Sequence, residues 1–533
     1  MFSKTKPSIN YNKIFFIFSI VFSIITTYFI TQSCIDSDAS SELVLAEHLA
    51  KNLAVLSEDW IYSTEIRFIN TQLVYAPLFL IFDSFHLVRF FGSVILQGIL
   101  IISFYFFTRL LNMDKKYFYL CAGLLLFPIS VCYGRIILYN CYYIPHISIS
   151  LLVVGLTFAK DTAKKSRIAQ IFLLMVLSLL GGLSGIRQLL MTHAPILLTV
   201  FIYYFIDDFL CKYNNSSFEK KRLKLLLIAV SSAVFSIIGF LINKVYLMEK
   251  YTFADYSENT ISLLNPDDIK NVLYGFFHHF GFRDEIPLLS VLGVLSVLGI
   301  FLGIACLIVS FFGILKYKSN KNIQETVPLI FFISYAVVMA FVFLVIGNGY
   351  YFVLYFTPLT IWMLPVFVLQ INYIPKGISV FNLKKLLPYT AIFIILLNGI
   401  FNSVYFLNDN YFQQKYEGLR YHEKNQKENL SAAVSFLEKE NYELGYATFW
   451  NGNIITEMTD GDVKIINLSI NEYSGKTEYH NWLTLKSNRN LQNQKSFILL
   501  ENNLQTVFEN KNDLTNCEIV YKDDKFIIYN LAK

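Results

Sequence analysis

The sequence predicts a polytopic α-helical membrane protein with about eleven transmembrane helices and a small external α/β domain at the C-terminal end. Hydrophobic residues make up 55% of the 533 residues and charged residues only 16%, whereas an ordinary soluble domain carries about 25% charged residues. Apolar runs of roughly 20 residues, the length that crosses a bilayer, recur until about residue 406 and then stop. Basic residues also alternate between the predicted loops, as membrane topology requires.

The apolar runs define a membrane domain over residues 1–406. We expect transmembrane helices at 13–32, 87–111, 117–134, 136–158, 168–185, 189–206, 223–247, 287–315, 326–346, 350–370 and 387–406. The polar remainder, 407–533, starts with an amphipathic helix at 430–444 and continues with short apolar runs at 445–450, 463–470, 496–500, 519–521 and 526–529. Strand-length runs mixed with a helix predict a small α/β domain.

The orientation follows from the basic residues. Loops on the side of the N-terminus are rich in Lys and Arg, as in the segment 220–224, and loops on the other side carry fewer. The positive-inside rule therefore predicts a multi-pass protein of the cell membrane with a cytoplasmic N-terminus and an extracytoplasmic segment 407–533. The chain has no basic block typical of a nucleic-acid surface, so we expect no nucleic-acid partner. The seven scattered cysteines lack metal-ligand spacing.

The first external loop, predicted at 33–86, opens with an acidic motif, Asp36-Ser37-Asp38. An amphipathic helix over about 40–50 follows and is expected to lie on the membrane surface. Two carboxylates separated by one residue favour a general base or a divalent-metal site. The alternative is that Ser37 or Asp38 caps the helix while Asp36 is solvated, and the spacing alone leaves both open.

Three arginines lie at predicted external helix ends, at Arg135, Arg187 and Arg283, the last at the end of a second external loop, 248–286. An arginine beside a bilayer suits a phosphate group, because the guanidinium donates bidentate, charge-assisted hydrogen bonds. The alternatives are snorkelling to lipid headgroups and, for Arg283, pairing with the two acids that follow it.

Four further polar residues on this side are expected substrate contacts: Glu65, Asn140, His278 and His279. For the two histidines, a structural role is the alternative.

This arrangement resembles the GT-C glycosyltransferases, such as protein mannosyltransferases and bacterial aminoarabinose transferases, which use polyprenyl-phosphate sugars. The resemblance covers 1–406 and rests on the first span, the motif Asp36-Ser37-Asp38 with the helix after it, and the segment 135–140. The C-terminal segment resembles their external domains only in position. Some of these families carry a second acid where this chain has Asn140.

The resemblance implies transfer of a sugar from a polyprenyl-phosphate donor to a glycan, lipid or protein acceptor of the cell envelope, on the outer face, with inversion. Asp36 or Asp38 would be the general base, and Arg135, Arg187, Arg283 or a divalent metal ion would stabilise the leaving phosphate. Three other functions stay open: a polysaccharide polymerase or ligase, a lipid-linked glycan transporter or flippase, and a non-catalytic envelope scaffold.

Overall fold

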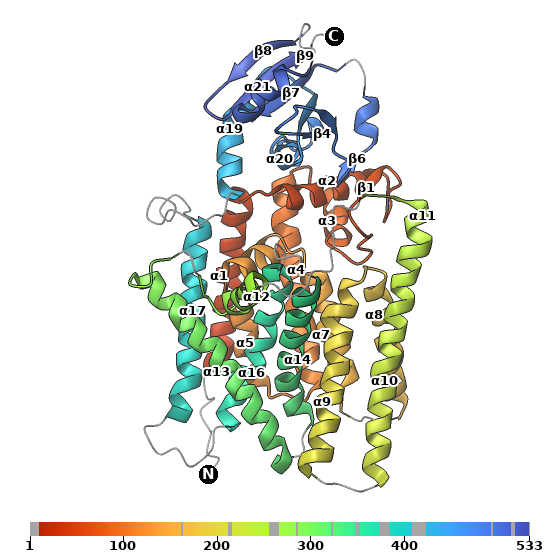
Figure 1. The fold of residues 1–533 in the computed structure, drawn as a ribbon, viewed down its shortest axis with the longest axis vertical. Coiled ribbons are helices and arrows are strands. Elements are labelled where there is room, and N and C mark those ends of the chain that lie inside the picture. Colours follow the sequence, from red (N-terminus) through yellow and green to blue (C-terminus); the bar gives the residue numbers. More distant parts are fainter. Residues whose placement is uncertain are drawn as a thin grey trace, which may run out of the picture.

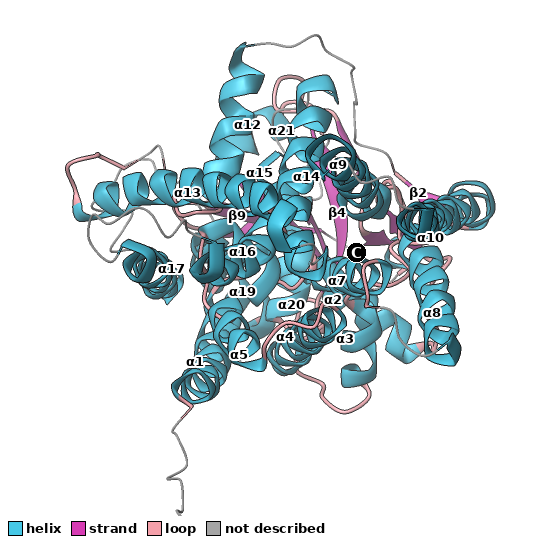
Figure 2. Ribbon diagram, turned by 90° about the horizontal axis from the view of Figure 1, so that it is seen from below, coloured by secondary structure: helices cyan, strands magenta, loops and turns pink. Residues whose placement is uncertain are grey.

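The protein is a bundle of long helices that carries a mixed α/β domain on one end (Figure 1). The computed structural model describes residues 10–160, 164–211, 216–254, 266–283, 286–320, 323–346, 352–373, 383–407, 423–491, 494–512 and 517–531. Figure 2 views the molecule from the end without the sheet. In this view the strands lie behind the middle of the helix bundle, so the α/β domain lies over the bundle.

Seven of the described helices are long and apolar enough to cross a membrane. They lie in α1 (Tyr11–Ser33), α4 (Phe85–Leu110), α8 (Lys164–Gly182), α10 (Ser216–Leu241), α13 (Val291–Asn320), α14 (Ile323–Ile346) and α17 (Leu383–Leu407). Shorter helices are η2 (Leu189–His193), α9 (Ala194–Cys211), η3 (Ile242–Leu247), α11 (Met248–Lys250), α12 (Pro266–His278), α15 (Phe352–Phe356) and α16 (Leu359–Tyr373). The predicted membrane class is confirmed, but the number of eleven spans is not: with one bent pair counted, the described helices give up to eight.

Two predicted spans, 117–134 and 136–158, are wrong as straight helices. The segment instead forms α5 (Lys115–Leu125), α6 (Val131–Tyr133), the π-helical turn η1 (Gly134–Tyr139) and α7 (Ile144–Thr157), with a bend of 91° before α7. Pro128 cannot continue α5, Ser130 caps α6 by accepting from the Tyr133 amide at 3.1 Å, and Pro145 starts α7. The two prolines and the serine cap therefore interrupt the helix within a stretch whose hydropathy is continuously high.

A buried glutamine fixes the bent segment to its neighbours. The Gln97 side chain in α4 donates to the carbonyl of Leu138 at 2.7 Å and to Thr27 Oγ1 at 3.0 Å. Its own oxygen accepts from Ser23 Oγ at 2.8 Å. Such bonds between helices satisfy backbone groups that a π-helical turn leaves without a regular partner.

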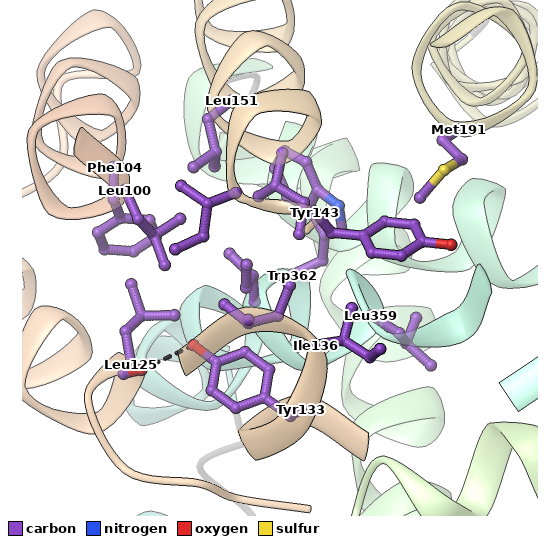
Figure 3. Packing of buried hydrophobic residues seen from close by; sticks show 14 of the residues in the cluster. Leu100, Phe104, Leu125, Tyr133, Ile136, Tyr143, Leu151, Met191, Leu359 and Trp362 are labelled. Carbon is purple, nitrogen blue, oxygen red and sulfur yellow. Dashed lines mark hydrogen bonds between the residues drawn. The ribbon is translucent and has the colours of Figure 1, made fainter. Parts of the chain in front are cut away.

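Apolar packing also holds the bend (Figure 3). The Tyr133 hydroxyl donates to the carbonyl of Leu125 at 2.7 Å, which joins α6 back to α5. The Trp362 ring of α16 packs against Phe331 and Phe107, with ring centroids 4.5 and 5.4 Å apart. The bend is therefore a packed feature of the core.

The α/β domain contains a six-stranded sheet in the order β5-β4-β3-β7-β9-β8, in which β3 runs parallel to β4 and β7 and the other pairs are antiparallel. Its strands are β3 (Leu444–Thr448), β4 (Lys464–Ile470), β5 (Thr477–Tyr479), β7 (Ser496–Glu501), β8 (Cys517–Lys522) and β9 (Phe526–Leu531). Its helices are α19 (Glu423–Lys439), α20 (Phe449–Met458) and the short α21 (Gln505–Glu509). The predicted strand regions are confirmed.

The helix predicted at 430–444 ends earlier, at Lys439. Asn441 adopts a left-handed conformation with φ 54°, and the Tyr442 amide donates to the carbonyl of Leu437 at 3.0 Å. This is the hydrogen bond that closes a helix at an asparagine C-cap.

The first loop joins the two parts of the molecule. Strand β1 (Trp60–Tyr62) pairs with β2 (Thr252–Phe253) and with β6 (Thr484–Leu485) of the C-terminal domain. Helix α2 (Ser37–Lys51) crosses the end of the bundle between α3 (Gln72–Phe79) and α20 (Figure 1). The helix predicted over about 40–50 is therefore present as part of α2, and α20 of the C-terminal domain packs against it.

A buried ion pair fixes the C-terminal domain in place. Arg89 of α4 donates from Nε to Glu457 Oε1 of α20 at 2.8 Å, and from Nη2 to Oε2. Ser40 of α2 donates to the same carboxylate at 2.6 Å. Asp460 accepts from the Phe85 amide at 2.8 Å, at the start of α4. These contacts hold α2 between the bundle and the C-terminal domain.

Candidate active site

Asp36 is the N-cap of α2 and is almost completely buried, with 3% of its surface exposed. Its Oδ1 accepts from the backbone amides of Asp38 at 2.9 Å and Ala39 at 3.2 Å. The preceding Ile35 is buried in the core of the C-terminal domain. The alternative in which Asp36 is solvated and Ser37 or Asp38 caps the helix is therefore wrong.

The bent segment supplies three more donors to the same carboxylate. Arg135 Nη2 and Asn140 Nδ2 donate to Asp36 Oδ2 at 3.2 and 2.8 Å, and the Tyr142 hydroxyl donates to Oδ1 at 3.0 Å. The amide of Asn140 suits this position, because an acid there would face Asp36 with like charge. Asp36, Asp38, Arg135, Asn140 and Tyr142 are called the Asp36 cluster below.

Asp38 lies beside Asp36 but has a different environment. It is half-buried, and its Oδ1 has no hydrogen-bond partner. Burial and the neighbouring Asp36 carboxylate raise the pKa of Asp38 to about 7, against the opposing charges of Arg135 and Arg67. A carboxylate with a pKa near neutral is matched to general base catalysis.

Sequence reasoning missed a second acid on the same helix, Glu42. Asn70 Nδ2 donates to both of its oxygens, at 3.0 and 3.1 Å, and Arg67 Nη1 lies 3.7 Å from Oε1. Burial raises the pKa of Glu42, while Arg67 acts in the opposite direction. The signal in the sequence was the four-residue spacing from Asp38, which puts both acids on one helix face.

Arg187 is held by two aromatic rings. Its guanidinium carbon lies 4.9 Å from the centroid of Tyr143 and 5.3 Å from that of Tyr355. The positive charge of Arg187 acts on Glu42 as well, where it opposes to a small extent the rise in pKa that burial causes. Stacked on these rings, the guanidinium keeps a defined orientation towards the group of charges at this end of the bundle.

Glu65 positions the turn that carries Arg187. Its Oε2 accepts from the Ile186 amide at 3.1 Å. Gly185 has φ 101°, and a Cβ there would lie 1.8 Å from Glu65 Oε2, so the turn requires glycine. The geometry gives Glu65 a positioning role here.

Arg283 makes its described contacts elsewhere. Its guanidinium donates to Asn402 Oδ1 of α17 and lies 5.4 Å from the Phe401 ring, and its amide donates to Ser296 Oγ of α13 at 2.7 Å. His278 is buried against Tyr274, with ring centroids 5.5 Å apart.

His279 Nδ1 lies 3.3 Å from Thr360 Oγ1 of α16. The acids Asp284 and Glu285 that follow Arg283 lie outside the described residues. His278, His279, Arg283 and Asn402 are called the Arg283 group below. Its described contacts connect α12 to α13, α16 and α17, and do not include the residues of the Asp36 cluster.

Asp36 and Asp38 do not fit a divalent metal ion well. Both Asp36 oxygens already accept hydrogen bonds, two from backbone amides and three from side chains. Within the described ranges, no group of three or more His, Cys, Asp or Glu side chains is placed to hold a metal ion. A metal prefers several oxygen ligands with available lone pairs, and the oxygens of Asp36 offer few.

The chain matches no protein-family model and no curated protein sequence. Its structure matches crystal structures of ArnT from Cupriavidus metallidurans bound to undecaprenyl phosphate (TM-score 0.53, 11% identity) and in the apo state (TM-score 0.55, 10% identity). Each match covers 96% of this chain and 97% of the ArnT chain. The chain has the fold of ArnT. The fold that the resemblance of residues 1–406 implied is thereby confirmed.

Proposed function

We propose that this protein is a glycosyltransferase that moves a sugar from a polyprenyl-phosphate donor to an acceptor of the cell envelope. The observation that carries the proposal is the environment of Asp38, a carboxylate with a raised pKa beside Arg135 and Arg67 at the end of the helix bundle. The ArnT fold supports it, because one of the matched ArnT structures is bound to undecaprenyl phosphate.

Asp38 is the general base in this proposal, and Asp36 is a positioning residue. Asp38 removes the proton from an acceptor hydroxyl as its oxygen attacks the anomeric carbon of the donor sugar. The bond from that carbon to the phosphate oxygen breaks in the same step, so the anomeric configuration inverts. Asp36 cannot serve as the base as readily, because its oxygens accept five hydrogen bonds.

Arginines stabilise the leaving polyprenyl phosphate in this proposal. Arg135 is 26% exposed and held by Asp36 at 3.2 Å, and Arg187 is held between Tyr143 and Tyr355. Preorganised guanidinium groups stabilise charge that develops on a phosphate oxygen without first having to reorient. The isoprenoid chain stays in the bilayer, since these residues lie at helix ends.

The positive-inside bias supports an extracytoplasmic site. With the N-terminus in the cytoplasm, α2 and the C-terminal domain face outwards. A lipid-linked donor suits that compartment, because it needs no soluble nucleotide sugar there. The acceptor is then a glycan, lipid or protein of the envelope.

The test uses the full chain in lipid nanodiscs with a panel of undecaprenyl-phosphate sugars and envelope extract as acceptor. Release of undecaprenyl phosphate and formation of a glycosylated product are followed by mass spectrometry. Asp38→Asn is expected to lower kcat by about 100- to 10,000-fold, as loss of a general base does, with unchanged thermal stability. Glu58→Gln is the matched control, because Glu58 is an exposed acid of the same loop.

Full transfer by Asp38→Asn would contradict the assignment of the base. Movement of lipid-linked sugar across vesicles without a new glycosidic bond would instead favour the flippase function.

A further inference from the structure

A second concentration of basic side chains surrounds a cavity at the other end of the bundle. The cavity has a volume of about 140 Å³ and lies among α7, α8, α9, α10 and the start of α14. Its basic lining residues are Arg167, Lys221, Arg222 and Lys224. Because α10 continues through η3 and α11 to β2, which pairs with β1, the start of α10 lies far from α2 (Figure 1).

The two arginines of this cavity are buried and held in place. Arg167 and Arg222 are only 8% and 7% exposed. Arg167 Nη1 donates to the Leu156 carbonyl and to Gln170 Oε1, both at 3.2 Å. The guanidinium carbon of Arg222 lies 5.3 Å from the Tyr204 ring centroid. Their orientation is therefore fixed by the fold rather than by solvent.

The lining complements an anion. Besides the four basic side chains it contributes hydroxyl and amide groups from Thr157, Tyr203 and Gln324. Among the described residues of the lining there is no carboxylate. Guanidinium and ammonium groups that converge on one cavity bind phosphate through charge-assisted hydrogen bonds.

An apolar groove continues from the basic cavity. It has a volume of about 330 Å³ and lies between α8 and α10, lined by Ile171, Met175, Leu223 and Leu227 among others. Lys224 and Ile228 line both the cavity and the groove, so the two are contiguous. A charged cavity joined to an apolar groove on the surface of a membrane helix pair matches an amphiphile.

We propose that this site binds an anionic phospholipid, with the headgroup phosphate in the basic cavity and an acyl chain in the groove between α8 and α10. The basic-residue bias predicts that this end of the bundle faces the cytoplasm, where bilayers present anionic lipids. The proposal rests on the cavity and its charges and is independent of the glycosyltransferase activity.

The test measures binding of lipids to the purified full chain in neutral detergent by native mass spectrometry. The probes are phosphatidylglycerol, phosphatidylcholine and glycerol phosphate, which separate a charged lipid, a lipid without net charge and a headgroup without acyl chains. Phosphatidylglycerol is expected to bind most tightly. Arg167→Gln/Arg222→Gln is expected to weaken its binding by about tenfold or more, as loss of two charged contacts does.

Arg109→Gln/Lys115→Gln is the matched control, because it removes two exposed basic residues from the α4–α5 connection. If the arginine variant does not fold, Lys221→Gln/Lys224→Gln replaces it, since both lysines are exposed. Equal weakening by the control pair, or unchanged binding in the cavity variants, would overturn the site. Glycerol phosphate binding as tightly as phosphatidylglycerol would overturn the lipid as its occupant.

Discussion

The Asp36 cluster and the Arg283 group look alike in the sequence and differ in what their arginines contact. Each has an arginine at a helix end on the predicted external side, near other polar residues. Arg135 pairs with a buried carboxylate of the first loop at 3.2 Å, whereas Arg283 donates to the side chain of Asn402 in α17 and stacks near Phe401. Two arginines with similar positions in the sequence therefore have different described partners, one a carboxylate and the other an amide. We expect Arg135, beside a carboxylate, to act on the substrate, and Arg283, beside an amide, to act in helix packing.

The largest expected effect is a difference in the rate of sugar transfer between variants of Arg135 and Arg187 and a variant of Arg283. Arg135→Gln and Arg187→Gln are each expected to lower kcat/KM of sugar transfer by about 100- to 1,000-fold, because each removes a preorganised donor to the leaving phosphate. Arg283→Gln is expected to keep transfer within severalfold of the unchanged protein. The measurement is kcat/KM of sugar transfer at steady state, for the three variants in nanodiscs.

The same three variants are compared by thermal unfolding. Arg283→Gln is expected to destabilise the protein by about 1–3 kcal/mol, since a buried Asn402 carbonyl loses its donor. A loss of transfer in Arg283→Gln as large as that in Arg135→Gln, with normal stability, would place Arg283 in the active site and remove the distinction.

The next effect is a loss of folding stability when the Asp36 carboxylate is removed. Asp36→Asn is expected to lower the free energy of unfolding by about 3 kcal/mol, because Arg135 keeps its charge and loses its buried partner. A double-mutant cycle with Arg135→Gln, followed by chemical unfolding, measures the coupling between the two residues. Additive effects of the two substitutions would mean that the ion pair does not hold the bent segment to α2.

A smaller, pH-dependent effect is expected at Asn140. Asn140→Asp places a second carboxylate against Asp36, so the pKa of the new acid is raised in the folded state. The variant is therefore destabilised at about pH 8 and recovers as the pH falls and that acid is protonated. Melting temperatures at about pH 8 and pH 5 make the measurement. Asn140→Ala is the control, because it loses the hydrogen bond equally at both pH values. Equal loss in both variants at both pH values would contradict a like-charge contact.

Much of the fold was predictable because it depends on local sequence. Long apolar runs predicted the membrane helices, and short apolar runs predicted the strands β3, β4, β7, β8 and β9 but not β5 and β6. The bend between η1 and α7 was missed because hydropathy averages over Pro128 and Pro145, although both prolines were visible in the sequence. The end of α19 was placed late because a single left-handed residue, Asn441, closes that helix.

The candidate site was predictable in Asp36 and Asp38, and less so in the roles of these two acids. The motif at 36–38 and Arg135 drew attention to the loop and the segment whose side chains form the Asp36 cluster. Spacing could not show that Asp36 accepts five hydrogen bonds while Asp38 keeps an oxygen without a partner. Nor could it place Arg67 beside Glu42, because that contact depends on how the first loop folds back over the bundle.

The pH dependence of sugar transfer tests most directly whether Asp38 is the general base and Asp36 a positioning residue. A general base must be deprotonated, so kcat of the unchanged protein is expected to rise with pH and level off above an inflection near 7, the pKa to which burial and Asp36 raise Asp38. In Asp38→Asn, the small residual rate is expected to lack this inflection, and in Glu58→Gln the inflection is expected to remain. An inflection near pH 7 that persists in Asp38→Asn would contradict the account and assign the titrating group to another residue.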